Sequence, residues 1–163
     1  MEELEIIIRH LEEYFAGRDG DLVGKTILIT AGPTYEKIDP VRFIGNYSSG
    51  KMGFALADEC AARGAKVILV AGPVQQKTHY PIYQRHDVES AAEMFDTVVS
   101  LFGSVDAAIL SAAVADYTPE RVADQKIKRE KTGEMTLDLK PTQDIAAYLG
   151  NLKKQCPGCL LYT

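Results

Sequence analysis

The chain has 163 residues, of which 46% are hydrophobic and 25% are charged, and its formal net charge is −5. This size suits one domain with a substantial core, and the acidic balance argues against nucleic acid or an anionic membrane as the main partner, because both attract a basic surface. The sequence shows no signal peptide and no apolar run that could span a bilayer, and its three cysteines do not form a disulfide framework, so we expect a cytoplasmic protein.

The hydrophobic pattern predicts strands that alternate with helices. In chain order, the predicted elements are a helix over 2–15, a linker over 17–21, a strand at Thr26–Thr30, a helix over Lys51–Arg63, strands at Lys66–Ala71 and Ile82–His86, a helix from Ser90 to about Phe102, a strand at Ala107–Leu110, a mobile polar loop over 117–134, a strand at Met135–Leu139 and a helix over Gln143–Asn151 capped by Thr142. This order predicts an α/β fold: a three-layer, Rossmann-like sheet, mostly parallel, with helices on both faces. We divide the chain into an N-terminal helix and linker, 1–23, and a main domain, 24–163.

Two segments are candidates for a ligand site. Small residues around Gly32 follow the first strand, and Ser48-Ser49-Gly50 opens the next helix, where exposed backbone N–H groups attract anions. Ser111–Lys128 follows another strand. Since ligands of parallel sheets lie beyond the carboxyl ends of the strands, Ala31–Gly50 and Ser111–Lys128 should meet at one crevice that holds a phosphate-bearing ligand.

Two familiar nucleotide motifs fit imperfectly. Gly45–Lys51 matches a phosphate loop, but Met52 stands where a magnesium-binding Ser or Thr is required, and the loop does not leave the first strand directly. A nicotinamide-binding reading is also open, although the strand Lys66–Ala71 ends without an acid for a ribose hydroxyl.

Cys156-Pro-Gly-Cys159 has redox or metal spacing, but it has no partner ligands and does not open a helix, so a turn into a final strand is favoured. No residue is assigned to a metal.

Four motifs occur together in one order: Ile29–Thr34, Asp39–Gly53, Ala112–Tyr117 and Lys126–Lys128. In these motifs the chain resembles the phosphopantothenoylcysteine synthetase domain of coenzyme A biosynthesis, over about residues 24–150. This domain is usually the C-terminal half of a bifunctional protein whose other half is an FMN-dependent decarboxylase. The resemblance implies that CTP activates 4′-phosphopantothenate as an acyl-cytidylate, that Mg²⁺ accompanies the nucleotide, that the cysteine amine displaces CMP, and that the enzyme is a homodimer.

The resemblance also implies roles for individual residues. Asn46 and Lys126 would be catalytic. The substrate would contact Arg42, Asn46, Ser48, Ser49 and Gly50. The nucleotide would contact Gly32, Ser111, Ala112, Asp116, Lys126, Thr142, Gln143, Asp144 and Ile145, although the family often has Asn-Pro-Asp-Ile where this chain has Thr142–Ile145.

The two ends of the chain depart from the family's domain. Residues 1–16 resemble the closing helix of the decarboxylase half, and the family continues beyond position 163 into a lysine-bearing loop of the nucleotide pocket. We therefore expect this chain to fold but to ligate cysteine poorly. An NAD(P)-binding oxidoreductase and a nucleotide-binding module without turnover are the alternative functions.

Overall fold

The fold is taken from a computed structural model that describes residues 20–128, 134–154 and 158–163. The helix predicted over 2–15 and most of the predicted linker lie outside these residues. No helix in the described ranges is long and apolar enough to cross a membrane.

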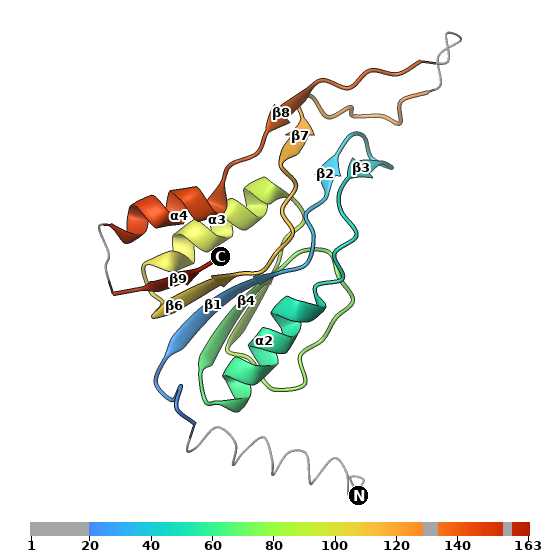
Figure 1. The fold of residues 1–163 in the computed structure, drawn as a ribbon. Helices are drawn as coiled ribbons and strands as arrows, with labels where there is room; N and C mark the ends of the chain where they lie inside the picture. The colour runs from blue at the N-terminus through green and yellow to red at the C-terminus, as the bar shows by residue number, and fades with distance from the viewer. Residues whose placement is uncertain (1–19, 129–133, 155–157) are drawn as a thin grey trace, which may run out of the picture.

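A five-stranded sheet forms the centre of the domain, and every neighbouring pair of its strands is parallel (Figure 1). Its order is β5-β4-β1-β6-β9. The strands are β1 (Thr26–Ala31), β4 (Lys66–Ala71), β5 (Gln84–Asp87), β6 (Ala107–Leu110) and β9 (Leu160–Tyr162). The predicted parallel sheet is confirmed, as is the final strand after Cys159. The short strand expected at Ile82–His86 begins and ends later, because only Gln84–Asp87 pairs with β4.

Helices cover both faces of this sheet, as predicted (Figure 1). On one face, α2 (Lys51–Ala62) packs Phe54 and Ala57 against Ile29 and Leu69. On the other face, α3 (Ala91–Phe102) and α4 (Ile145–Lys153) cover a second apolar cluster that contains Leu28 and Met94. Successive residues of β1 thus enter opposite cores, which explains why the central strands are continuous apolar runs rather than alternating ones.

The helix starts test the capping predictions. Ser90 caps α3 as expected, because its Oγ accepts from Glu93 N at 3.2 Å. The cap predicted at Thr142 is wrong: Asp144 is the N-cap of α4, and its carboxylate accepts from Ala147 N at 2.8 Å. The Thr142 hydroxyl instead donates to the Ala115 carbonyl at 2.6 Å, so it ties α4 to the loop after β6.

Two hairpins project from the carboxyl edge of the sheet, and together we call them the arm (Figure 1). One pairs β2 (Glu36–Lys37) with β3 (Phe43–Ile44), the other pairs β7 (Tyr117–Pro119) with β8 (Leu139–Pro141), and β2 lies against β7. The sequence prediction missed the first hairpin and placed Tyr117–Pro119 in a loop.

The strand predicted at Met135–Leu139 is also wrong, since β8 contains only Leu139–Pro141 of this region. Met135 and Leu139 are 48% and 46% exposed, so the alternation that suggested a strand faces no core.

Candidate functional site

Two chain segments that follow β1 and β6 lie side by side at the carboxyl edge of the sheet. The Asn46 amide donates to the Ala113 carbonyl at 2.6 Å, and Ala113 N donates to the Gly32 carbonyl at 2.8 Å. The Asn46 side-chain oxygen accepts from Ser48 N at 3.1 Å, which closes the turn before α2. The predicted meeting of the Asn46 loop with Ser111–Asp116 is confirmed.

Two threonine hydroxyls fix the loop that follows β6. Thr30 Oγ1 accepts from the backbone N–H groups of Ser111 and Ala112, both at 3.1 Å. Thr34 Oγ1 accepts from Ala115 N at 3.0 Å. Sequence reasoning missed both roles. Thr30 lies in an apolar strand and fits the strand propensity alone, whereas Thr34 lies in the loop that follows. The available signal for Thr30 was a hydroxyl at the end of an otherwise apolar strand.

Gly32 and Gly50 face each other across the turn before α2. Both have positive φ, 82° and 74°, which favours glycine. A Cβ on Gly50 would lie 3.3 Å from the Gly32 Cα, so the two backbones approach closely. No side chain caps α2 through a hydrogen bond, and its first turn carries no acidic residue. The start of α2 is therefore electrostatically suited to an anion.

A cavity of about 320 Å³ lies beside this junction, and we call it the edge pocket. Its lining contains six of the predicted nucleotide-contacting residues: Ala112, Asp116, Thr142, Gln143, Asp144 and Ile145. Thr30, Leu110, Val114, Ala115, Ala146 and Thr163 also line it and were not predicted. Ser111 and Gly32 reach this region through the backbone contacts given above.

A larger cavity of about 600 Å³ lies between α3 and the arm and shares Thr142 and Gln143 with the edge pocket. Its charged lining is mostly carboxylate, with Glu36, Glu89, Glu93 and Glu120 against Lys37 and Lys140. Both cavities carry carboxylates, so charge does not distinguish them. The edge pocket is the better candidate for a nucleotide because it contains six of the predicted nucleotide-contacting residues.

Arg42 and Lys126 are not among the described residues that line the edge pocket. Both belong to the arm, where Arg42 binds Asp39 and Lys126 is exposed. Their predicted contacts with substrate and nucleotide remain predictions, as do those of Ser48 and Ser49.

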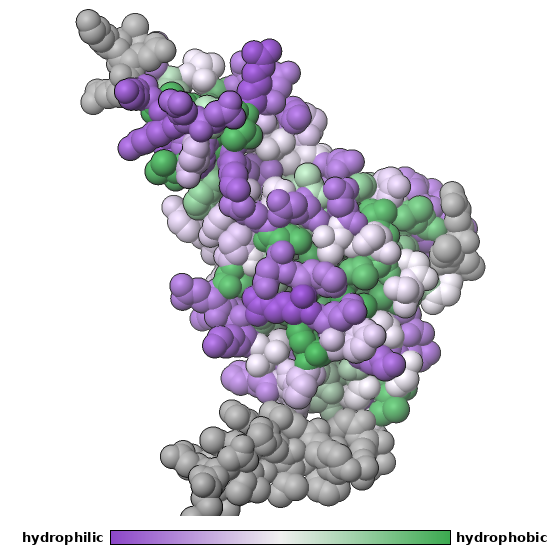
Figure 2. All heavy atoms as spheres, turned by 180° about the vertical axis from the view of Figure 1, so that it is seen from behind, coloured by the Kyte–Doolittle hydropathy of each residue, from purple (hydrophilic) through white to green (hydrophobic). Residues whose placement is uncertain are grey.

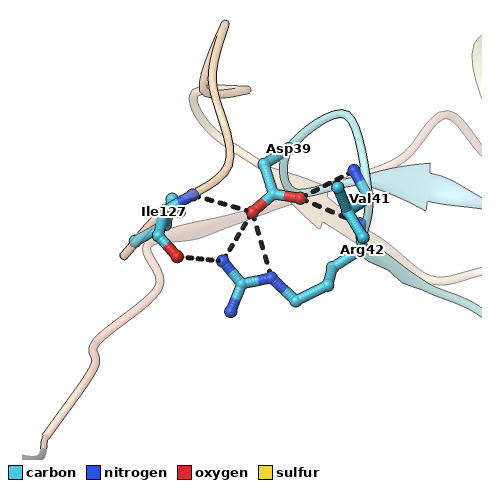
Figure 3. Close-up of polar contacts among 4 residues, drawn as sticks. All are labelled: Asp39, Val41, Arg42 and Ile127. Atoms are coloured by element: carbon cyan, nitrogen blue, oxygen red, sulfur yellow. Dashed lines mark hydrogen bonds and ion pairs between the residues drawn. The ribbon is translucent and has the colours of Figure 1, made fainter. Parts of the chain in front are cut away.

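Asp39 is a charged residue of the arm to which the sequence prediction gave no role. It is 1% exposed, and its carboxylate accepts from the backbone N–H groups of Val41 and Arg42 at 2.8 and 2.9 Å. It also accepts from the Arg42 guanidinium and from Ile127 N, the latter at 3.1 Å (Figure 3). The guanidinium, followed by these backbone donors, holds the pKa of Asp39 well below its usual range. The available signal was an acid three residues before an arginine within the Asp39–Arg42 motif.

The depressed pKa of Asp39 predicts a pH-dependent stability. The pKa is lower in the folded chain than in the unfolded one, so ionised Asp39 contributes its full stabilisation above the ordinary value of 3.8, and this contribution is lost as pH falls through the lower folded value. In urea unfolding, we expect the free energy of unfolding to decrease below about pH 4 more steeply for the wild type than for Asp39→Asn. Equal slopes for the two proteins would contradict the assignment.

The parallel sheet, with its glycine-containing turn and its pocket at the carboxyl ends of the strands, defines a Rossmann-like α/β domain. The chain belongs to the family described as the DNA/pantothenate metabolism flavoprotein C-terminal domain, whose model matches residues 22–160. The family expected from the four sequence motifs is thereby confirmed.

Individual relatives agree with this assignment. The coenzyme A biosynthesis bifunctional protein CoaBC of Bacillus subtilis is 47% identical over 156 residues, which are 95% of this chain and 38% of that protein. A cysteine/cysteine sulfinic acid decarboxylase from an unknown prokaryotic organism is 51% identical over 95% of this chain and 44% of its own length. The chain thus spans less than half the length of these relatives.

A solved structure supports the fold. The crystal structure of the C-terminal domain of a bifunctional CoaBC protein is similar with a TM-score of 0.71 and 45% identity. The similarity covers 86% of this chain and 63% of that one.

Proposed function

We propose that this domain catalyses the ligation of 4′-phosphopantothenate with cysteine in coenzyme A biosynthesis. In the first step, a substrate carboxylate oxygen attacks the α-phosphorus of CTP, giving an acyl-cytidylate and releasing pyrophosphate. In the second step, the cysteine amine attacks the acyl carbon, CMP leaves, and the amine loses a proton as the amide forms. The observation that carries the proposal is the Asn46–Ala113 hydrogen bond, because it joins two of the family motifs beside the edge pocket.

The edge pocket suits the nucleoside part of the nucleotide. Asp116 and Asp144 are acceptors on its wall, and a base amino group and ribose hydroxyls are donors. The phosphates would extend toward the Gly32–Gly50 turn and the start of α2, where charge and backbone N–H groups favour an anion. In this arrangement Asn46 lies between the two substrates, where its amide can bind the acyl oxygen.

Mg²⁺ would enter with the nucleotide. The described residues contain no group of three or more His, Cys, Asp or Glu side chains that could hold a metal ion by themselves. A Mg²⁺ ion that is coordinated by phosphate oxygens needs only one or two protein carboxylates. Asp116 at the wall of the edge pocket could supply one of them. The ion would neutralise phosphate charge.

We further propose a cytoplasmic homodimer that uses the arm as its contact surface. The arm exposes apolar side chains that a monomer leaves in water: Val41, Phe43, Tyr117, Val122, Met135 and Leu139. Figure 2 shows apolar surface between hydrophilic patches where the arm projects. Sedimentation velocity tests this part, and a monomer at micromolar concentration would contradict it.

A pyrophosphate-release assay with CTP and 4′-phosphopantothenate tests the proposed reaction, using the complete gene product. Pyrophosphate should appear without cysteine, and amide product with CMP should appear once cysteine is added. ATP in place of CTP tests nucleotide choice, and thermal shifts with NAD and NADP test the oxidoreductase alternative. CTP binding without pyrophosphate would instead indicate a nucleotide-binding module without turnover.

The segment 120–128 is expected to become ordered around the nucleotide. In the free protein its backbone makes contacts at Glu120, Ala123 and Ile127, to Asp138, Ile38 and Asp39 respectively. Amide hydrogen exchange should therefore show protection at these three positions without ligand, and at Lys126 and the remaining positions of the segment only with CTP and Mg²⁺. Strong protection along the whole segment in the free protein would contradict this prediction.

A further inference from the structure

The arm brings together two chain segments that each carry a predicted phosphate-binding cation. Arg42 stands in the turn between β2 and β3, and Lys126 stands in the chain that leaves β7. The sequence alone does not indicate that these two segments lie side by side. Besides the backbone bond from Ala123 N to the Ile38 carbonyl, the segments are joined by side-chain contacts among Asp39, Arg42 and Ile127, which we call the Asp39 clamp (Figure 3).

The Asp39 clamp forms hydrogen bonds with both polar groups of the Ile127 backbone. Ile127 N donates to Asp39 Oδ2 at 3.1 Å, and the Arg42 guanidinium donates to the Ile127 carbonyl at 3.0 Å. Side chains thus take the place of a neighbouring strand. Because one residue is held by its own N–H and C=O, the segment cannot slide by a residue without breaking both bonds. Lys126 and Lys128 are the residues directly before and after Ile127, so the clamp also restricts their positions.

The same carboxylate also orients Arg42. Asp39 Oδ2 accepts from Arg42 Nε at 3.0 Å and from a terminal guanidinium nitrogen at 2.5 Å, a two-point contact that sets the plane of the guanidinium. The Asp39 side chain is fully buried, whereas the Arg42 side chain remains 39% exposed. The acid is therefore out of reach of a ligand, while the arginine keeps an accessible surface.

Charge in this region favours a phosphate. Asp39 and Arg42 neutralise each other, which leaves Lys126 and Lys128 as exposed cations within one residue of the clamp. A buried carboxylate costs desolvation energy, which here is offset by five hydrogen bonds. An apolar side chain at position 39 could fill the space but could not hold two segments in register.

We propose that Asp39 is a positioning residue, whose carboxylate holds Arg42 and the Lys126 segment in the arrangement that meets the phosphate-bearing substrates. This inference rests on the proposed ligase function. Asp39 acts through Arg42 and Ile127 and touches no reacting atom. The cysteine amine carries no phosphate, so its recognition does not depend on the clamp.

The test compares Asp39→Asn with Asp21→Asn in the complete gene product. Asp21→Asn is a matched control because Asp21 also pairs with an arginine, Arg63 at the end of α2, outside the site. We expect Asp39→Asn to lower kcat/KM for CTP and for 4′-phosphopantothenate by about 10–100-fold, through higher KM values caused by misplaced cations, and to leave the KM for cysteine unchanged. Asp21→Asn should change each constant less than about twofold, and Arg42→Lys should fall between the two.

A merely structural role would give a different pattern. Partial unfolding lowers the amount of active protein, so kcat would fall for every substrate while the KM values stay constant. Unchanged KM values for CTP and 4′-phosphopantothenate in folded Asp39→Asn would therefore overturn the proposal.

Hydrogen exchange at the Ile127 amide gives a readout that does not depend on the reaction. It should accelerate at least tenfold in Asp39→Asn and not in Asp21→Asn, and an unchanged rate would overturn the clamp. A wild-type protein that releases no pyrophosphate would overturn the ligase function, and the Ile127 exchange would then still support or overturn the clamp.

Discussion

Replacement of Asn46 by alanine is expected to lower the rate of acyl-cytidylate formation by about 100–1,000-fold, the usual effect of removing one preorganised donor from a developing charge. The variant should retain most of its affinity for CTP, because Asn46 does not line the edge pocket. Single-turnover pyrophosphate release measures the first effect, and a CTP titration measures the second.

The structure supplies sharper variants for this prediction. Asn46→Asp retains an oxygen that can accept from Ser48 N, but it replaces the donor that faces the Ala113 carbonyl. It should therefore be as inactive as Asn46→Ala. Asn151→Ala, in an exposed turn of α4, is the control and should be fully active. Wild-type turnover in Asn46→Ala would remove Asn46 from the mechanism.

Gly72→Ala is expected to have the largest effect on stability. A Cβ at position 72 would lie 1.7 Å from the Pro33 carbonyl oxygen, which is backbone and cannot rotate away. Gly72 N also donates to the Ala31 carbonyl at 2.8 Å, so the chain after β4 lies directly on the chain after β1. Separating them should cost about 3 kcal/mol in the free energy of unfolding, measured with urea.

Gly150→Ala is the matched control for this substitution. Among the described residues, no atom beyond the adjacent residues and the helix's own backbone lies within 4 Å of a Cβ at position 150, inside α4. Removing a helical glycine should stabilise the protein by up to about 1 kcal/mol. If both glycine variants shift stability in the same direction, the close approach at Gly72 is not the cause.

The central sheet could be predicted because its strands carry their own signal. β1 and β4 are buried on both faces, all three of β1, β4 and β6 read as continuous apolar runs, and Ser90 marks the start of α3. The arm carries no such signal. β2 and β3 contain two residues each, and β7 and β8 contain three each. Large apolar side chains of the arm also face water, so the sequence of the arm shows no regular alternation of apolar and polar residues.

The sequence motifs assigned residues that the fold brings together, whereas partners distant in sequence were missed. Ala112, Asp116 and Thr142–Ile145, assigned through the family resemblance, line one cavity, and their contacts with a nucleotide stay predictions. The partners of Asp39 and Thr30 were missed because Ile127 and Ala112 lie 88 and 82 positions away. Only the folded sheet, for Thr30, and the folded arm, for Asp39, bring those groups within hydrogen-bonding distance.

The separation between the two walls of the edge pocket also bears on folding. Thr30 and Ala112, which both line the pocket, are 82 positions apart, and Asn46 and Ala113, which are hydrogen-bonded beside it, are 67 apart. A growing chain that has been synthesised only through α3 contains Thr30 and the Gly32–Gly50 turn, but it still lacks β6 and the pocket residues that follow it. Closing so long a loop costs entropy that local contacts do not repay, so the pocket arises late, when β6 pairs with β1. A ligand that needs both walls can bind only the completed sheet, and its binding energy therefore stabilises the whole domain against unfolding rather than one loop.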